Sequence, residues 1–224
     1  MKFYRIIQDL IYPNKCLVCN KLSEGVAECV CKGCITALEF IGSSNRLGRI
    51  QYCTGIEEVY SVWIYDKGLK EIINALKYED HARVGADLAR FAAILLPRNI
   101  ASEIDLITPV PLHSSKKRER GYNQSHWIAK TLADEWQIDY SQKVLVKVKS
   151  TQSQTRMNLD ERKNNIENSI KWKKPLNGLI VGIVDDIITT GATVSECGQQ
   201  LKLAGAKKVI AISCGSPRNF TLNQ

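Results

Sequence analysis

Two neighbouring acids and a hydroxyl-rich turn form the clearest chemical feature of this sequence. The apolar run at residues 179–184 is followed by Asp185 and Asp186, and then by Ile-Ile-Thr-Thr-Gly-Ala-Thr, which ends at Thr193. A β-branched run with almost no charge is typical of a parallel strand buried on both faces. Open α/β sheets bind ligands at the carboxyl ends of such strands. We therefore expect a ligand beside the two carboxylates.

The turn after the acids has the composition of a phosphate site. Gly191 and Ala192 leave backbone N–H groups accessible, and hydroxyls come from Thr189, Thr190 and Thr193. We expect a helix over residues 194–204, whose N-terminus would favour an anion. Acids beside a phosphate cradle indicate a sugar phosphate. The alternative is the Walker B strand of an NTPase, but neither G-x-x-x-x-G-K-[ST] nor G-x-G-x-x-G occurs in the sequence.

A second chemical feature is a set of paired cysteines near the start of the chain. Cys16 and Cys19 form one C-x2-C pair, and Cys31 and Cys34 form another after eleven intervening residues. Four thiolates at this spacing can converge on a tetrahedral zinc ion. Disulfide pairing is the competing interpretation, but it needs an oxidising compartment, and we identify no secretion signal. We predict a structural zinc site.

The other four cysteines are open to several interpretations. Cys29 and Cys53 could each replace one of the four zinc ligands, or lie near the site as bystanders. Cys197 and Cys214 fall in segments of core-like composition, where a free cysteine behaves as a small buried hydrophobe.

Length and composition fit one α/β domain with a small additional module. The chain has 224 residues, of which 44% are hydrophobic and 24% charged, as in soluble globular proteins. No apolar run approaches the roughly 20 residues that a membrane span needs. Residues 1–12 have helical spacing of apolar side chains, which predicts a packed amphipathic helix or, alternatively, a membrane-surface contact. We expect a cytoplasmic protein, at most peripheral at the inner membrane.

The expected secondary structure alternates between strands and helices. Apolar periodicity predicts strands at residues 59–65, 105–112, 144–148 and 209–213, and helices at 69–78, 84–96 and 125–136. This alternation implies a doubly wound parallel sheet. We place an N-terminal helix and a four-cysteine zinc module in residues 1–55, and the α/β domain in residues 56–224. We expect chelation of the module's metal to loosen residues 13–53 and to spare the α/β domain.

Positive charge is concentrated in two segments. The chain has a net charge of +8, to which residues 116–120 contribute +3 and residues 143–174 contribute +6. Such charge beside an anion site would concentrate anionic ligands, although charged runs are by default solvated surface. Tyr122 and Trp127 follow the first segment and could stack bases of single-stranded DNA. Alternatively, the charges serve a small ligand alone and both aromatic side chains pack inside.

Several motifs together resemble known families. The two acids with their threonine-rich turn resemble the phosphoribosyl pyrophosphate (PRPP) motif of type I phosphoribosyltransferases. Pro-Val-Pro-Leu-His at residues 109–113, the basic stretch at 116–124, residues 154–165 and the cysteine pairs resemble the ComF family of competence proteins over nearly the whole chain. That family is similar to the phosphoribosyltransferase domain of glutamine amidophosphoribosyltransferase. Many members carry a third cysteine pair near Cys53, where this chain has a single cysteine.

The resemblance implies a fold of the type I phosphoribosyltransferase kind, a zinc module and a PRPP site with Mg²⁺ bound mainly by the ligand. Asp185 and Asp186 would contact the ribose hydroxyls, and the 5′-phosphate would be bound by Thr189, Thr190, Gly191, Ala192 and Thr193. The pyrophosphate loop would consist of Val110, Pro111, Leu112 and His113. The candidates to close over the pyrophosphate are Arg118, Arg120, Arg162 and Lys163, and Arg162 is assigned to catalysis together with the two acids. The implied role is in handling single-stranded DNA during natural transformation, with a DNA-uptake helicase as a partner.

Two function classes remain open from the sequence. Pyrophosphate leaves C1 of the ribose through an oxocarbenium-like state, so the enzyme needs anion clamps and Mg²⁺ more than a covalent nucleophile. The sequence supplies these parts, but it identifies no acceptor and no general base, for which His113 and His126 are candidates by residue type alone. The chain is therefore either a PRPP-dependent transferase or a non-catalytic protein that senses PRPP or binds single-stranded DNA.

Overall fold

The structure is a computed structural model, and it describes residues 15–22, 29–42, 53–78, 82–115, 118, 121–148 and 169–218. The helix expected over residues 1–12 lies outside the described residues, as do Lys116, Lys117, Arg120, Arg162 and Lys163.

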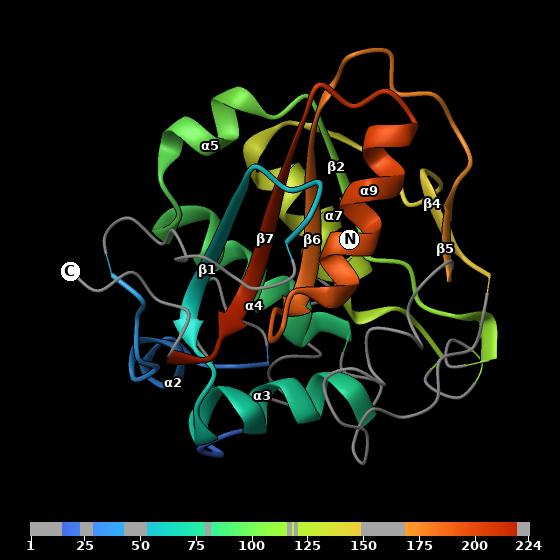
Figure 1. Cartoon of the computed structure of the whole chain (residues 1–224). Coiled ribbons are helices and arrows are strands. Elements are labelled where there is room, and N and C mark those ends of the chain that lie inside the picture. Colours follow the sequence, from blue (N-terminus) through green and yellow to red (C-terminus); the bar gives the residue numbers. More distant parts are fainter. Residues whose placement is uncertain are drawn as a thin grey trace, which may run out of the picture.

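The centre of the fold is a parallel sheet of five strands in the order β1-β7-β6-β2-β3 (Figure 1). Each pair of neighbours is parallel. The strands are β1 (Glu58–Ile64), β2 (Leu106–Pro109), β3 (Asp139–Tyr140), β6 (Ile180–Ile187) and β7 (Lys208–Ser216). The strands β6 and β7 are mostly apolar in sequence. Each has a neighbouring strand on both sides, and both faces of the sheet are covered by other elements.

Helices cover both faces of this sheet. Strand side chains such as Val62, Ile107 and Ile212 pack with α3 (Lys67–Tyr78), α4 (Ala82–Leu95) and α7 (Gln124–Trp136). Side chains at alternate positions, such as Val181, Ile183 and Val209, pack with α9 (Ala192–Leu203) on the other face (Figure 1). The predicted fold class, a doubly wound α/β protein, is confirmed. No described helix is long and apolar enough to cross a membrane.

A small antiparallel ribbon lies beside α9, outside the main sheet (Figure 1). It consists of β4 (Leu145–Lys147) and β5 (Ile170–Trp172). The strand predicted at residues 144–148 is present, but it pairs with β5 and not with the parallel sheet. The sequence analysis missed β5, because this three-residue strand lies within a mostly polar and charged stretch.

The N-terminal unit, which we also call the four-cysteine unit, comprises the described residues 15–22 and 29–42. It is joined to the sheet and shares its core. It contains the short helix α2 (Lys32–Thr36), and the segment after it lies antiparallel to β1. The Ile41 N–H donates to the Val62 carbonyl at 3.0 Å, and the Ile64 N–H donates to the Glu39 carbonyl at 2.8 Å. This pairing covers the β1 edge of the sheet, where an open edge would invite association with other chains.

Several element boundaries differ from the predictions. Strand β6 continues through both acids to Ile187, because Asp185 stays in register with Ser213 of β7 and Ile187 with Gly215. Helix α9 begins at Ala192, two residues earlier than predicted. The sequence analysis also missed α5 (Arg98–Glu103) and β3, which are too short to show a period.

Helix α3 lies across the carboxyl ends of β1 and β7 (Figure 1). Gly215 of β7 permits this close packing, since a Cβ atom there would lie 2.3 Å from Cδ2 of Leu69 and 2.8 Å from Cδ1 of Ile187. The carboxyl edge of the sheet is therefore bordered by α3 near β7 and by the loops after β2 and β6.

Candidate functional site

Asp185 and Asp186 lie in the last part of β6, at the carboxyl edge of the sheet, and both are half-buried. Asp185 Oδ1 accepts hydrogen bonds from Ser125 Oγ and from the Asp186 N–H, each at 2.9 Å. Asp186 Oδ1 accepts one from the Ile187 N–H at 2.8 Å. These bonds orient both carboxylates at the edge where a parallel sheet binds its ligands.

The start of α7 connects the two loops of this edge. The Val110 N–H donates to the Val184 carbonyl at 2.9 Å, so the loop after β2 begins beside Asp185. Asn123 Nδ2 donates to the Val110 carbonyl at 2.9 Å, two residues before Ser125. The sequence analysis missed Ser125; its signal is a polar side chain in the first turn of a helix that follows the predicted pyrophosphate loop.

The predicted pyrophosphate loop continues with Pro111, Leu112 and His113, all half-buried. His113 Nδ1 lies 2.8 Å from Ser115 Oγ and accepts the Ser115 N–H at 3.2 Å. Because Nδ1 accepts a backbone N–H, a neutral ring carries its proton on Nε2. His113 is therefore poorly suited to act as a general base through Nδ1.

The threonine-rich turn leads into α9 with the geometry of an anion site. Gly191 precedes the helix with a left-handed φ of 80°, which favours glycine. Thr190 Oγ1 accepts the Ala192 N–H at 3.4 Å, and Thr189 is exposed. The N-cap residue Gly191 makes no side-chain cap hydrogen bond, and the first turn of the helix contains no acid. Its N-terminus therefore keeps its preference for an anion.

Glu196 of α9 holds the ribbon in place. Its carboxylate is buried and accepts hydrogen bonds from the Ser169 N–H at 2.6 Å, Ser169 Oγ at 3.0 Å and the Ile170 N–H at 2.9 Å. Three donors satisfy a buried carboxylate that would otherwise be costly to desolvate. The sequence analysis treated this glutamate only as part of a helix.

Lys147 of the ribbon lies close enough to Glu196 of α9 and to Asp185 to interact with both electrostatically. It is in register with Ile170, and it shares a face of β4 with Leu145; both of these neighbours are buried. Burial lowers the pKa of Lys147, while the nearby carboxylates of Glu196 and Asp185 act in the opposite direction. Among the described residues, no carboxylate forms an ion pair with its ammonium group. The sequence analysis counted Lys147 only within a basic segment.

The aromatic side chains predicted to stack bases differ in their surroundings. The Tyr122 hydroxyl donates to the Leu76 carbonyl of α3, and its half-buried ring packs against the core. Of the two alternatives for Tyr122, the structure therefore supports packing against the core and not stacking on bases. Trp127 is 37% exposed, with its ring centroid 5.4 Å from that of His126. His126 Nδ1 lies 2.5 Å from the Tyr140 hydroxyl, outside the acid site.

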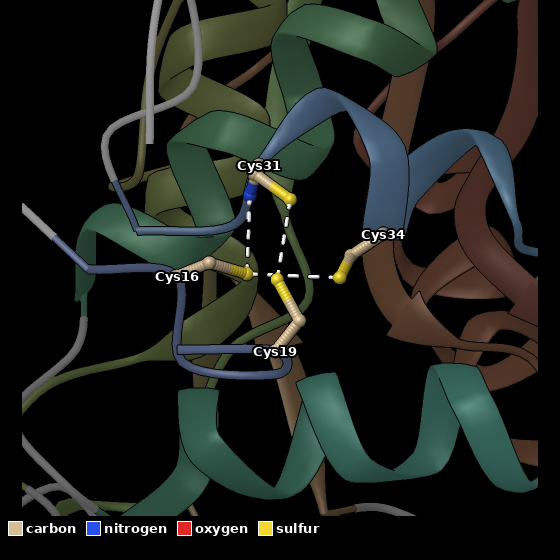
Figure 2. A group of neighbouring side chains, drawn as sticks. All are labelled: Cys16, Cys19, Cys31 and Cys34. Carbon is tan, nitrogen blue, oxygen red and sulfur yellow. Dashed lines mark hydrogen bonds between the residues drawn. The ribbon is translucent and has the colours of Figure 1, made fainter. Parts of the chain in front are cut away.

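Four cysteines converge at the N-terminal unit (Figure 2). The sulfur atoms of Cys16, Cys19, Cys31 and Cys34 lie within 4.8 Å of one another. The Cys16–Cys34 and Cys19–Cys31 sulfur distances are both 3.7 Å. Tetrahedral zinc with Zn–S bonds of about 2.3 Å places its sulfur ligands about 3.8 Å apart. The group thus has the composition and spacing to hold a metal ion such as zinc.

The electrostatics of the cysteine group also favour thiolate formation at one ligand. Burial raises the pKa of the Cys16 thiol, but the Cys31 N–H and other hydrogen bonds outweigh it and lower the pKa to about 6. Burial and the neighbouring thiols raise the pKa of Cys34. Among the described residues, Cys29 and Cys53 do not belong to the group; Cys53 is half-buried beside the core under α9.

The chain was compared with known proteins. No family model matches it. The DNA utilization protein YhgH of Salmonella typhimurium is 31% identical over 157 residues, which cover 68% of this chain and 69% of the relative. The competence protein ComFC of Streptococcus pneumoniae is 21% identical and covers 89% of this chain and 98% of the relative. The solved glutamine PRPP amidotransferase of B. subtilis, complexed with ADP and GMP, is 20% identical over 62% of this chain and 30% of that chain, with a TM-score of 0.39.

Proposed function

This chain belongs to the ComF family, with the DNA utilization protein YhgH and the competence protein ComFC, and we propose that it binds PRPP, or a closely related phosphoribosyl ligand, in the service of DNA utilization. One observation supports the ligand most directly: two oriented carboxylates lie at the end of β6, shortly before a helix N-terminus whose N-cap is a glycine and whose first turn has no acid. Carboxylates suit ribose hydroxyls, and the helix N-terminus suits a phosphate.

Each part of the ligand has a proposed partner. Asp185 and Asp186 accept hydrogen bonds from the ribose hydroxyls. The 5′-phosphate is bound by the turn and first helical residues Thr189, Thr190, Gly191, Ala192 and Thr193. The pyrophosphate lies along the loop of Val110, Pro111, Leu112 and His113, with Arg162 from outside the described residues closing over it. Mg²⁺ is bound mainly by ligand oxygens, since it prefers to keep few protein ligands.

We further propose that Lys147 contributes positive charge to this site. Replacing it in the variant Lys147→Met should lower the affinity for Mg·PRPP about tenfold or more, since a hydrogen bond to a charged group contributes about 1.5–3 kcal/mol. Calorimetry would measure the change. Lys171→Met is the matched control, because Lys171 lies on the opposite face of the same ribbon and is exposed. Equal affinities in the two variants would exclude Lys147 from the site.

Whether the bound ligand reacts is tested by its products. The chain is incubated with Mg·PRPP, with and without single-stranded DNA, and pyrophosphate is measured. Release above the rate of the protein-free control would identify a transferase or hydrolase, since pyrophosphate is the leaving group of phosphoribosyl transfer. Binding without release, in both conditions, would assign the chain to PRPP sensing.

We also propose that the basic segment at residues 116–120 binds single-stranded DNA, as the family's role in DNA utilization suggests. Changing Lys116, Lys117, Arg118 and Arg120 to Ala should weaken binding and reduce the slope of log K against log salt by up to about 3, since each phosphate contact on a single strand contributes about 0.7. Fluorescence anisotropy at several salt concentrations measures both quantities.

The control for this experiment changes Arg98 and Lys207 to Ala. Both are exposed; Arg98 begins α5, the helix before β2, and Lys207 directly precedes β7. The control's affinity and salt slope should equal those of the unchanged chain. Loss of affinity to the same extent in both variants, or absence of binding at low salt, would leave the small ligand as the only use of the basic segment.

A further inference from the structure

Asp87 of α4 is a charged side chain in the protein core. It is 0% exposed, so its carboxylate needs hydrogen-bond donors to offset the loss of water. Arg90 Nη1, one helical turn later, donates to Oδ1 at 3.1 Å. Two further donors come from the four-cysteine unit: the Cys29 N–H donates to Oδ2 at 2.7 Å and the Val30 N–H at 3.1 Å. A core helix of the α/β domain thus binds the backbone of the N-terminal unit.

These two N–H groups directly precede the second pair of cysteines. The next N–H, that of Cys31, donates to Cys16 Sγ at 3.3 Å (Figure 2). Cys31 is also the residue before α2, which carries Cys34. Asp87 therefore orients the segment that brings Cys31 and Cys34 toward Cys16 and Cys19.

The packing around this contact is continuous between the two parts of the chain. Cys16, Val30 and Ile35 are buried in the same core cluster as Leu69 and Ile72 of α3. The cluster also contains Leu88, next to Asp87 on α4. Forming the four-sulfur group and packing α3 with α4 consequently involve many of the same contacts.

We propose that Asp87 is a positioning residue of the four-cysteine metal centre and that it couples metal binding to the folding of the α/β domain. The proposal depends on the four cysteines binding a metal ion. Asp87 does not touch that ion; it fixes the backbone of the segment that carries two of the ligands, Cys31 and Cys34. Outer-shell partners of this kind commonly change metal affinity 10- to 100-fold when replaced. The four-cysteine unit is then not an independent module, contrary to the expectation that chelation would spare the α/β domain.

The first test measures zinc affinity by competition with a chromophoric chelator. Asp87→Asn keeps the shape and one carbonyl oxygen but removes the charge, and it should weaken zinc binding about 10- to 100-fold. Asp134→Asn is the matched control, because Asp134 is an exposed carboxylate that pairs with Lys130 at 2.9 Å on α7. Equal affinities in the two variants would overturn the role of Asp87 while leaving the metal centre intact. Absence of zinc binding in the unchanged chain would overturn both.

The second test needs no variant, in case Asp87→Asn fails to fold. Hydrogen exchange of the unchanged chain is compared before and after zinc removal. Exchange should become faster in α3 and α4 as well as in residues 29–42. Faster exchange confined to residues 15–42 would overturn the coupling.

Discussion

Replacing Asp185 and Asp186 together by asparagine is expected to abolish measurable binding of Mg·PRPP and to leave the fold intact. Two charge-assisted hydrogen-bond acceptors are lost, each contributing about 1.5–3 kcal/mol, so the affinity should fall by at least about 100-fold. The fold should persist because both side chains are only half-buried, and an asparagine oxygen can still accept the bonds from Ser125 and the backbone. Calorimetry measures the affinity, and thermal unfolding the stability.

A matched control is an acid that contacts the amino end of β6, opposite the end that carries the site acids. Asp105 is exposed and accepts the Ile180 N–H of β6 at 2.8 Å, as the site acids accept N–H groups of that strand at its carboxyl end. Asp105→Asn should leave the PRPP affinity unchanged. If the double variant binds Mg·PRPP as tightly as Asp105→Asn does, the assignment of the two acids is wrong.

Removing the metal is expected to destabilise the whole described fold. The purified chain should contain about one zinc ion, bound by Cys16, Cys19, Cys31 and Cys34. Because structural zinc contributes about 10 kcal/mol or more in small domains, loss of even half of that should lower the midpoint of thermal unfolding by about 10 °C or more. Elemental analysis and thermal unfolding with and without chelator measure both quantities.

The shape of the transition distinguishes the two views of the N-terminal unit. A single transition that shifts to lower temperature is expected if the unit shares its core with α3 and α4. An unchanged main transition after chelation would indicate an independent module, and a chain without metal in reducing buffer would contradict the zinc site.

The sequence predicted most of the parallel sheet because its longer strands and helices have clear apolar patterns. The apolar run of β6 and the helical stripe of α3 are examples. The prediction failed where the pairing between strands decides whether a strand forms and where it ends. Whether β6 ends before or after the acids depends on Ser213 and Gly215 of β7, and a strand as short as β5 forms only because β4 lies beside it.

The sequence could predict only those parts of the candidate site that lie within one continuous stretch of the chain. The acids, the turn and the cysteine pairs are local motifs, and they were found. Ser125 lies 60 residues from its partner Asp185, and Asp87 lies 58 residues from Cys29. No local pattern reports such contacts. The same limit left the surroundings of Tyr122 open, because its hydroxyl donates a hydrogen bond to the main chain of α3.

Calorimetric titration of the unchanged chain with Mg·PRPP tests the central claim most directly. We predict saturable binding of one PRPP per chain, weaker binding of ribose 5-phosphate because it lacks the pyrophosphate, and no heat of binding with Mg²⁺ alone. A folded, zinc-loaded chain that shows no saturable heat with Mg·PRPP up to millimolar concentration would contradict the proposed function.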